Sequence, residues 1–305
     1  MKKPKTLVIF NPAANHGRAK ELEKTIQSMV KDYGGLDWES TVAAGETKEI
    51  ALRAINNGYD HLIAIGGDGT TQEVVNGLLS MPKIKRPTLG IVPIGSGNDF
   101  AGSLGISKDY VNSLLAALTG KSHPVDVGLM RTNDGKKYWW VNVVGVGFDA
   151  VVDIRSRKMV FFTGFWLYLA AALQTILRNH TPYHFIGIMD DKKFERNLLM
   201  LVISNGKREG GGFKIAPLAF LDDGVLNYVG VSKISRIRML LTLPYFLNGT
   251  QDRLPYVEVG KLKKLEIIAD HPMQIHADGE IIAGFESKVT GLTIEVIPSA
   301  IKVIY

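Results

Sequence analysis

Residues 62–70 read Leu-Ile-Ala-Ile-Gly-Gly-Asp-Gly-Thr, and residues 71–79 continue with Thr-Gln-Glu-Val-Val-Asn-Gly-Leu-Leu. The stretch opens with four apolar residues, which is the signal of a short buried strand. Glycine then fills three of the next four positions. Valine and leucine pairs follow at the spacing of one helix face, so the stretch predicts a strand, a glycine turn and a helix.

This layout places backbone N–H groups and the positive end of a helix dipole against a phosphate group. Gly66, Gly67 and Gly69 let a bulky anion approach the main chain and allow a positive φ. A carboxylate does not attract phosphate, so Asp68 suits a loop that holds a metal-bound phosphate or handles a proton. The alternative without a function is a tight turn with a solvated Asp68. The run Gly-Gly-Asp-Gly-Thr favours the phosphate loop over this alternative.

The first 120 residues or so alternate strands with helices. Further strands are predicted at Thr6–Phe10, Trp38–Ala43 and Thr88–Val92, and helices at residues 22–34, at residues 47–57 and after Ser107 as N-cap. Short loops join them, which indicates an α/β domain with a doubly wound parallel sheet. Polar loops at residues 11–18, 66–70 and 93–99 each follow a strand, so we expect them to meet at the carboxyl edge of the sheet, where such folds bind ligands.

The pattern changes after Lys121 to strands separated by turns. Strands are predicted at Val125–Met130, Tyr138–Val144, Tyr183–Met189, Phe194–Ser204, Val225–Val231, Leu262–Ala269 and Gln274–Ala277, with closing strands over Leu292–Val303 interrupted at Pro298. This indicates a second, mainly antiparallel β-rich domain with a few helices. We therefore expect two domains, residues 1–124 and residues 125–291.

Composition narrows the class of protein. The chain has 305 residues, a net charge of +6 and no cysteine, so disulfides and Cys-ligated metals are excluded and a cytoplasmic protein is expected. The apolar run Leu7–Phe10 is too short for a secretory signal.

A pI of about 9.2 favours anionic partners such as nucleotides, nucleic acid or an acidic membrane surface. We find no arrangement of basic and aromatic residues typical of RNA binding, so we expect no nucleic-acid partner.

One apolar segment suggests contact with lipid. Met159–Leu177 contains nineteen uncharged residues, a borderline length for a membrane span, but polar residues interrupt it. Basic residues flank it on both sides: Arg155, Arg157, Lys158 and Arg178. We interpret the segment as a helix that is partly core and partly a docking face for lipid, and a plain core helix is the alternative.

Two acidic clusters follow later in the chain. Asp222-Asp-Gly224 fits an ordinary turn, or a site that holds a hard cation through carboxylate and carbonyl oxygens. Asp278-Gly-Glu280 fits a hairpin turn, or a second acidic site that serves a nucleotide loop. Two other patterns predict no site. Gly145–Ala150 lacks the acidic residue that follows a dinucleotide fingerprint, and Pro182 between His180 and His184 is incompatible with a metal-binding helix.

Together these motifs resemble the bacterial diacylglycerol kinase-like lipid kinases, relatives of the eukaryotic diacylglycerol and sphingosine kinases. The matching pieces are Asn11-Pro12 with Gly17, Gly66-Gly-Asp-Gly-Thr70 with Glu73 and Asn76, Pro93–Asp99, Gly145–Asp149, Ala216-Pro217, Asp222-Asp-Gly224 and Asp278-Gly-Glu280. These motifs are spread over nearly the whole chain, and their order and spacing are those of the family. NAD kinases and phosphofructokinase-like folds share the Gly-Gly-Asp-Gly motif, and the later motifs narrow the resemblance to lipid kinases.

The resemblance implies a kinase that uses ATP and Mg²⁺ to phosphorylate a lipid hydroxyl, that of diacylglycerol or a related lipid, in a cleft between the two domains. It also implies that the C-terminal strands, residues 292–305, return to the first domain. We therefore expect peripheral association with the cytoplasmic face of the membrane and a role in lipid metabolism. The acceptor region, including Met159–Leu177, resembles the family least, so the identity of the lipid stays open. The oligomeric state also stays open, and a homodimer is one possibility.

The family's motifs also assign roles to single residues. The implied nucleotide-binding residues are Asn11, Thr41, Gly66, Gly67, Asp68, Gly69, Thr70, Glu73, Ser96 and Glu280. The implied general base is Asp278, with Asp68 as the alternative for base or metal ligand. The implied magnesium ligands are Asp223, Asp222 and the carbonyl of Val225, which replaces an aromatic residue frequent in the family.

Two other functions stay open at this point. A soluble acceptor such as NAD would keep the reaction and change the substrate, but it would not need the apolar, base-flanked Met159–Leu177 segment. A binding protein that has lost turnover would keep the fold, and the filled acidic positions argue against it.

Overall fold

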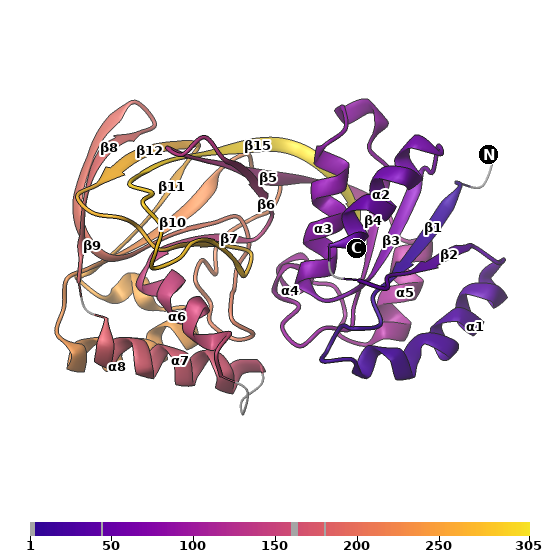
Figure 1. Cartoon of the computed structure of the whole chain (residues 1–305), viewed down its shortest axis with the longest axis horizontal. Coiled ribbons are helices and arrows are strands. Elements are labelled where there is room, and N and C mark those ends of the chain that lie inside the picture. Colours follow the sequence, from indigo (N-terminus) through magenta and orange to yellow (C-terminus); the bar gives the residue numbers. More distant parts are fainter. Residues whose placement is uncertain (1–3, 44, 160–163, 180) are drawn as a thin grey trace. The chain divides into compact units, whose positions relative to one another are not determined.

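The computed structural model describes residues 4–43, 45–159, 164–179 and 181–305 (Figure 1). The chain divides into two compact units. The first unit is Met1–Val125 with Ser299–Tyr305, and the second unit is Asp126–Pro298.

The first unit contains a parallel sheet with the strand order β2–β1–β3–β4. The strands are β1 (Thr6–Phe10), β2 (Asp37–Ser40), β3 (His61–Gly66) and β4 (Thr88–Pro93). The last residues of β15 (Gly291–Ile304) add a parallel strand beside β4, with Val303 opposite Leu89. The central strands are fully buried because helices cover both faces, which confirms the predicted doubly wound α/β fold.

Side chains alternate between the two faces of this sheet. Phe10 and Ile65 pack with Ile26 of α1 (Glu23–Tyr33) and Leu114 of α5 (Tyr110–Thr119). The helices α2 (Glu46–Asn56) and α3 (Asp68–Leu79) also belong to this unit. Two details differ from the prediction. Asp109, not Ser107, caps α5 by accepting a hydrogen bond from Val111 N, and a short unpredicted helix, α4 (Asp99–Leu104), follows β4.

The second unit is a β structure built around one long antiparallel strand, β9 (Lys192–Ser204). The first half of β9 pairs with β8 (Tyr183–Met189), and its second half lies between β7 (Val143–Gly147) and β10 (Leu226–Ser232). The remaining strands are β5 (Ser122–Thr132), β6 (Lys137–Trp140), β11 (Val257–Leu262), β12 (Lys264–Ala269), β13 (Ile275–Ala277) and β14 (Glu280–Ala283). The predicted strand Tyr138–Val144 is therefore two strands, and β15 continues through Pro298 without a break.

The sheet formed by β7, β9 and β10 has apolar side chains on both faces. Leu201 and Ile203 point into the core between the β layers, whereas Leu199 and Val202 face the helices. Three helices cover that second face: α6 (Phe148–Ser156), α7 (Gly164–Arg178) and α8 (Arg236–Asn248) (Figure 1). The space between this sheet and the three helices contains a cavity.

The apolar segment predicted over Met159–Leu177 belongs mostly to α7. This helix has 15 residues and is about 22 Å long, shorter than the roughly 30 Å of a bilayer core. Across the ranges that the structure describes, no helix is long and apolar enough to cross a membrane. One side of α7 is buried and the other exposed, so its core part is confirmed and lipid docking stays a prediction. Residues 160–163, which include Phe161, Phe162 and Thr163, lie outside the described residues, as does His180.

Candidate functional site

Most of the predicted nucleotide-binding residues lie at one edge of the first unit's sheet, whereas Glu280 lies on β14 in the second unit. Asn11 follows β1, Thr41 follows β2 and Ser96 follows β4, while residues 66–70 lie at the end of β3. Because these four strands are parallel neighbours, their carboxyl ends place the loops side by side. A direct contact links two of the loops, since Asn11 Nδ2 donates a hydrogen bond of 2.9 Å to Thr70 Oγ1.

Two of these loops also pack main chain against main chain. A Cβ atom on Gly95 would lie only 2.5 Å from the Cα atom of Gly67, so this approach requires glycine. Asp68 Oδ1 accepts a hydrogen bond of 3.1 Å from Phe100 N, in the first turn of α4. Burial raises the pKa of the Asp68 carboxyl, and backbone hydrogen bonds from residues 98–100 oppose that rise. Asp68 therefore joins the two loops, a role that the sequence did not predict.

The N-terminus of α3 faces the same edge. Gly67 is its N-cap and has no side chain to bond the first N–H groups of the helix, which leaves them suited to an anion. Glu73, one turn later, instead accepts a hydrogen bond of 3.1 Å from Thr47 N at the start of α2. The structure thus gives Glu73 a contact that fixes two helices together.

The predicted magnesium turn lies in the second unit. Its donors are the carboxylates of Asp222 and Asp223 and the carbonyl of Val225, all oxygens, which fits the chemistry of a hard cation. The Lys261 Nζ atom lies 2.9 Å from Asp223 Oδ2, so a protein cation already balances part of this charge. Gly224 N donates a hydrogen bond of 2.7 Å to the buried Asp126, which fixes the turn.

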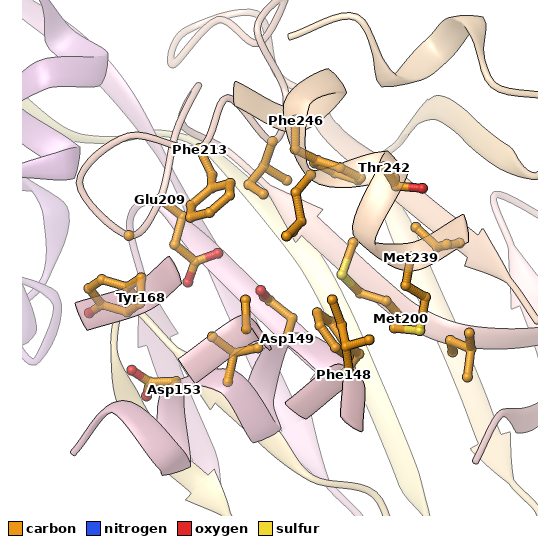
Figure 2. A pocket seen from close by; sticks show the side chains of 18 of the residues that line it. Phe148, Asp149, Asp153, Tyr168, Met200, Glu209, Phe213, Met239, Thr242 and Phe246 are labelled. Carbon is orange, nitrogen blue, oxygen red and sulfur yellow. The ribbon is translucent and has the colours of Figure 1, made fainter. Parts of the chain in front are cut away.

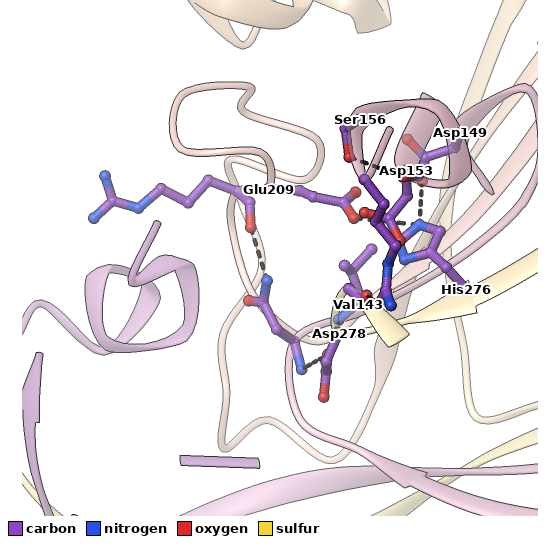
Figure 3. Close-up of polar contacts among 11 residues, drawn as sticks. Val143, Asp149, Asp153, Ser156, Glu209, His276 and Asp278 are labelled. Atoms are coloured by element: carbon purple, nitrogen blue, oxygen red, sulfur yellow. Dashed lines mark hydrogen bonds and ion pairs between the residues drawn. The ribbon is translucent and has the colours of Figure 1, made fainter. Parts of the chain in front are cut away.

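The Asp278-Gly279 turn is a tight hairpin between β13 and β14. Both residues have positive φ angles, 48° and 79°, which is the signature of the two-residue turn that Asp-Gly favours. The Asp278 carboxylate accepts backbone hydrogen bonds from three successive residues, Val141, Asn142 and Val143, at 2.7, 2.9 and 2.8 Å (Figure 3). These donors stabilise the ionised carboxylate and hold the link between β6 and β7. The role of Asp278 as general base stays a prediction.

A cavity in the second unit has the properties of an amphiphile site. It encloses about 790 Å³ of space outside the atoms, part of it open to solvent. Figure 2 shows the carboxylates of Asp149, Asp153 and Glu209 on one side of it. The rest of the lining is nearly all apolar and includes Phe148, Val152, Ala172, Ile176, Leu199, Met200, Phe213, Ile215, Val231, Ile234, Met239, Leu243 and Phe246.

A buried histidine organises this polar end. His276 on β13 is 0% exposed, and its Nε2 atom lies 2.8 Å from Asp149 Oδ2 and 3.2 Å from Glu209 Oε1 (Figure 3). Burial of the ring lowers its proton affinity, but the charges of Glu209, Asp149 and Asp153 outweigh burial and raise the pKa of His276 to about 10. This shift favours the imidazolium form of His276 at neutral pH. In that form the ring balances part of the negative charge of these carboxylates.

A glycine on β7 leaves room for the ion pair of His276 and Asp149. Gly145 on β7 is paired with His276 on β13. A Cβ atom at Gly145 would lie 2.0 Å from Asp149 Oδ2 and 2.2 Å from His276 Nε2, so any side chain there would displace the ion pair. The packing partner of this glycine is therefore the charged pair.

A third carboxylate, that of Asp153, connects the cavity to the Asp278 turn. Asp153 lies one helical turn after Asp149 on α6, and burial raises the pKa of its carboxyl. Arg157 Nε lies 3.9 Å from Asp153 Oδ2, and Arg157 also contacts the carbonyl of Gly279 and the carboxylate of Glu280. This arrangement can bind a molecule with a hydroxyl-bearing head and an apolar tail.

Sequence reasoning missed Glu209 and His276 and gave Asp149 no role of its own. Glu209 stands in a loop and His276 on a strand, 67 residues apart, and no local pattern links them. The one available signal was a histidine inside an otherwise apolar strand, next to the Asp278-Gly279 turn.

Comparison with known proteins gives consistent matches. Residues 5–130 match the family described as diacylglycerol kinase catalytic domain. Residues 142–305 match the family described as YegS C-terminal NAD kinase beta sandwich-like domain.

Curated relatives align with most of the chain. A protein of Chromohalobacter salexigens named "Probable lipid kinase YegS-like" is 33% identical over 248 residues, covering 80% of this chain and 75% of its own. A protein of the same name from Pectobacterium atrosepticum is 30% identical and covers 98% of this chain and 95% of its own. The diacylglycerol kinase of Bacillus subtilis is 27% identical over 90% of this chain and 88% of its own. A crystal structure from Bacillus anthracis described as a diacylglycerol kinase has the same fold, with a TM-score of 0.74 at 22% identity over 100% of this chain and 98% of its own.

Proposed function

Because this chain belongs to the family of YegS-like lipid kinases and bacterial diacylglycerol kinases, we propose that it transfers the γ-phosphoryl group of ATP to a lipid hydroxyl in a magnesium-dependent reaction. The observation that carries the proposal is the cavity with apolar walls and carboxylates at one end. A lipid acceptor has the same division, with a hydroxyl at one end and hydrocarbon behind it.

The first unit binds the nucleotide in this proposal. The glycine loop at residues 66–70 and the uncapped start of α3 receive the phosphates through backbone N–H groups. Phosphoryl transfer depends mainly on positioning and on charge stabilisation, and Mg²⁺, when bound, neutralises part of the phosphate charge. Asp222, Asp223 and the Val225 carbonyl form the protein's own candidate magnesium turn.

The second unit binds the acceptor. The apolar walls formed by α6, α7, α8 and the sheet hold the lipid chain, and the acceptor hydroxyl donates a hydrogen bond to Asp149 or Glu209. His276 pairs with both carboxylates and so helps to hold them at this end of the cavity. Diacylglycerol is the first acceptor to test, and a protein of this kind meets its lipid at a membrane surface.

The test is transfer of labelled phosphate from ATP, with Mg²⁺, to acceptors in detergent micelles. The panel contains diacylglycerol, monoacylglycerol, phosphatidylglycerol and a sphingoid base, and NAD is assayed in detergent-free buffer. We expect labelled lipid with at least one acceptor, and loss of that product in Asp149→Asn. Phosphorylation of NAD alone would establish a soluble acceptor. A protein that binds ATP but labels nothing would establish a binding function without turnover.

A further inference from the structure

The outward sides of α7 and α8 carry apolar side chains that no protein segment covers within the described residues. We call this surface the α7–α8 face; it consists of Trp166, Leu173 and Leu177 from α7 and Ile237, Leu241 and Tyr245 from α8. Trp166 is 65% exposed, Leu177 68% and Ile237 71%. Large apolar side chains exposed together mark an interaction surface.

The spacing of these residues places them on one stripe of each helix. Trp166, Leu173 and Leu177 are separated by seven and four residues, and the three α8 residues by four each. Other stripes of the same helices line the cavity described above, through Ala172 and Ile176 of α7 and Met239 and Phe246 of α8. The same two helices therefore separate the acceptor cavity from an apolar outer surface.

The charged side chains of α7 and α8 are all positive. Neither helix contains an acidic residue, while Arg178 ends α7 and Arg236 and Arg238 begin α8. The leaflet of an anionic bilayer complements this surface, because its interior is apolar and its headgroup layer carries negative charge.

A second, basic cavity lies beside this face. Arg155, Lys158, Arg178, Gln174 and Phe285 line it, together with Ile154 and Met159. Arg155 donates hydrogen bonds to the neutral oxygens of Gln174 and Asn179. Among the residues with described positions, none of Arg155, Lys158 and Arg178 makes an ion pair with a carboxylate, so three positive charges converge without a protein anion.

We propose that the α7–α8 face docks on an anionic bilayer, and that the cavity of Arg155, Lys158 and Arg178 receives the phosphate of a lipid headgroup. Docking of this kind places the wall of the acceptor cavity against the pool of lipid that the enzyme consumes. The purpose of the docking thus rests on the proposed function, but its test does not, because binding is measured without turnover.

The experiment measures binding of the whole protein to vesicles of phosphatidylcholine alone and of phosphatidylcholine mixed with phosphatidylglycerol. We expect binding only to the mixed vesicles, and weaker binding at higher salt. Arg178→Gln removes one cation and should weaken binding about fivefold. Leu177→Gln and Ile237→Gln should weaken it by similar factors while leaving transfer to micellar lipid intact.

Matched variants elsewhere on the same unit serve as controls. Ile186→Gln removes an exposed isoleucine of β8, and Lys192→Gln removes an exposed lysine of β9. Both should bind vesicles as the wild type does. Trp166 provides a reporter, because bromine-labelled lipids should quench its fluorescence in the wild type, and Trp166→Phe should lose that part of the quenching.

Three results would overturn the docking proposal. Equal binding to neutral and anionic vesicles would remove the charge argument. Effects of Leu177→Gln and Ile237→Gln on sedimentation of the free protein, with none on vesicle binding, would make the face an interface between protein chains. Tight binding of inorganic phosphate without vesicle binding would make the basic cavity a site for a free anion. A protein that binds vesicles but phosphorylates no lipid would instead keep the docking and refute the proposed function.

Discussion

His276 Nε2 lies 2.8 Å from Asp149 Oδ2 at the polar end of an otherwise apolar cavity. Glu209 Oε1, at 3.2 Å, gives the same ring nitrogen a second carboxylate. Removing one partner of a buried charged group costs about 3–5 kcal/mol, since it leaves the other charge uncompensated. The cluster is therefore a fixed polar base for the cavity, and its charge state has consequences that can be measured.

The first prediction concerns stability as a function of pH. Folding raises the pKa of His276 from an ordinary value of 6.5 to about 10. The protonated form is thus favoured in the folded state, and its contribution is complete below about pH 6.5 and declines as the pH rises towards 10. We expect the wild type to lose on the order of 3 kcal/mol over this window.

Urea unfolding across this pH range measures the effect. His276→Gln should be less stable at neutral pH, and its free energy of unfolding should vary less with pH than that of the wild type. His184→Gln, a change at a half-buried histidine on β8, should keep the wild-type dependence. Parallel curves for His276→Gln and the wild type above neutral pH would show that His276 does not titrate in this way.

The second prediction tests the space at Gly145. A Cβ atom there would overlap both Asp149 and His276, so Gly145→Ala should lower the free energy of unfolding by about 1–3 kcal/mol. It should also lower turnover with lipid while leaving the affinity for nucleotide unchanged. Gly284→Ala is the control, because the nearest atom to its Cβ would be 3.9 Å away. Wild-type stability and turnover in Gly145→Ala would contradict the close packing of the ion pair.

The third prediction separates two roles of Asp68. Its carboxylate accepts the Phe100 N–H, so Asp68→Ala should lower stability by about 1 kcal/mol and weaken nucleotide binding. Asp68→Asn keeps an acceptor oxygen and should preserve stability. Nucleotide titration and initial rates then distinguish the roles: normal ATP affinity in Asp68→Asn with turnover reduced by about two to four powers of ten would make Asp68 the general base.

The first unit was predictable from the sequence because its signals are local. The buried strand before Gly66, the glycine turn and the helix after it each occupy neighbouring residues, and the alternation of elements fixes the parallel sheet. The helix α4 was missed because it has six residues and its N-cap, Asn98, has a positive φ of 58° inside a glycine-rich loop. The strand β14 was missed for a similar reason, since it has four residues.

The acceptor site could not be read in the same way, because its residues meet only in the folded chain. Asp149 is 127 residues from His276, and Glu209 comes from a loop with no helical or strand period. The Asp278-Gly279 turn shows the opposite case. A hairpin turn was one of the two interpretations of its local sequence, and the structure has that turn, but the three backbone bonds to its carboxylate depend on residues more than 130 positions away.

The last prediction concerns whether Asp278 acts as the general base or only stabilises the link between β6 and β7. If Asp278 is the base, Asp278→Asn should lower turnover by about two to four powers of ten and leave ATP affinity unchanged. The same substitution should lower the free energy of unfolding by about 1–3 kcal/mol, because an amide NH₂ group would face a backbone N–H. Turnover alone therefore cannot separate the two roles.

Asp190 provides the control for this ambiguity. It also occupies a turn with positive φ, 45° against 48° for Asp278, and its carboxylate accepts backbone hydrogen bonds from Lys263 and Lys264. Asp190→Asn should thus lose a similar amount of stability and keep normal turnover. If both variants lose stability and turnover to the same extent, Asp278 only holds the link between β6 and β7. The proton acceptor would then have to be sought at Asp149, whose carboxylate lines the acceptor cavity.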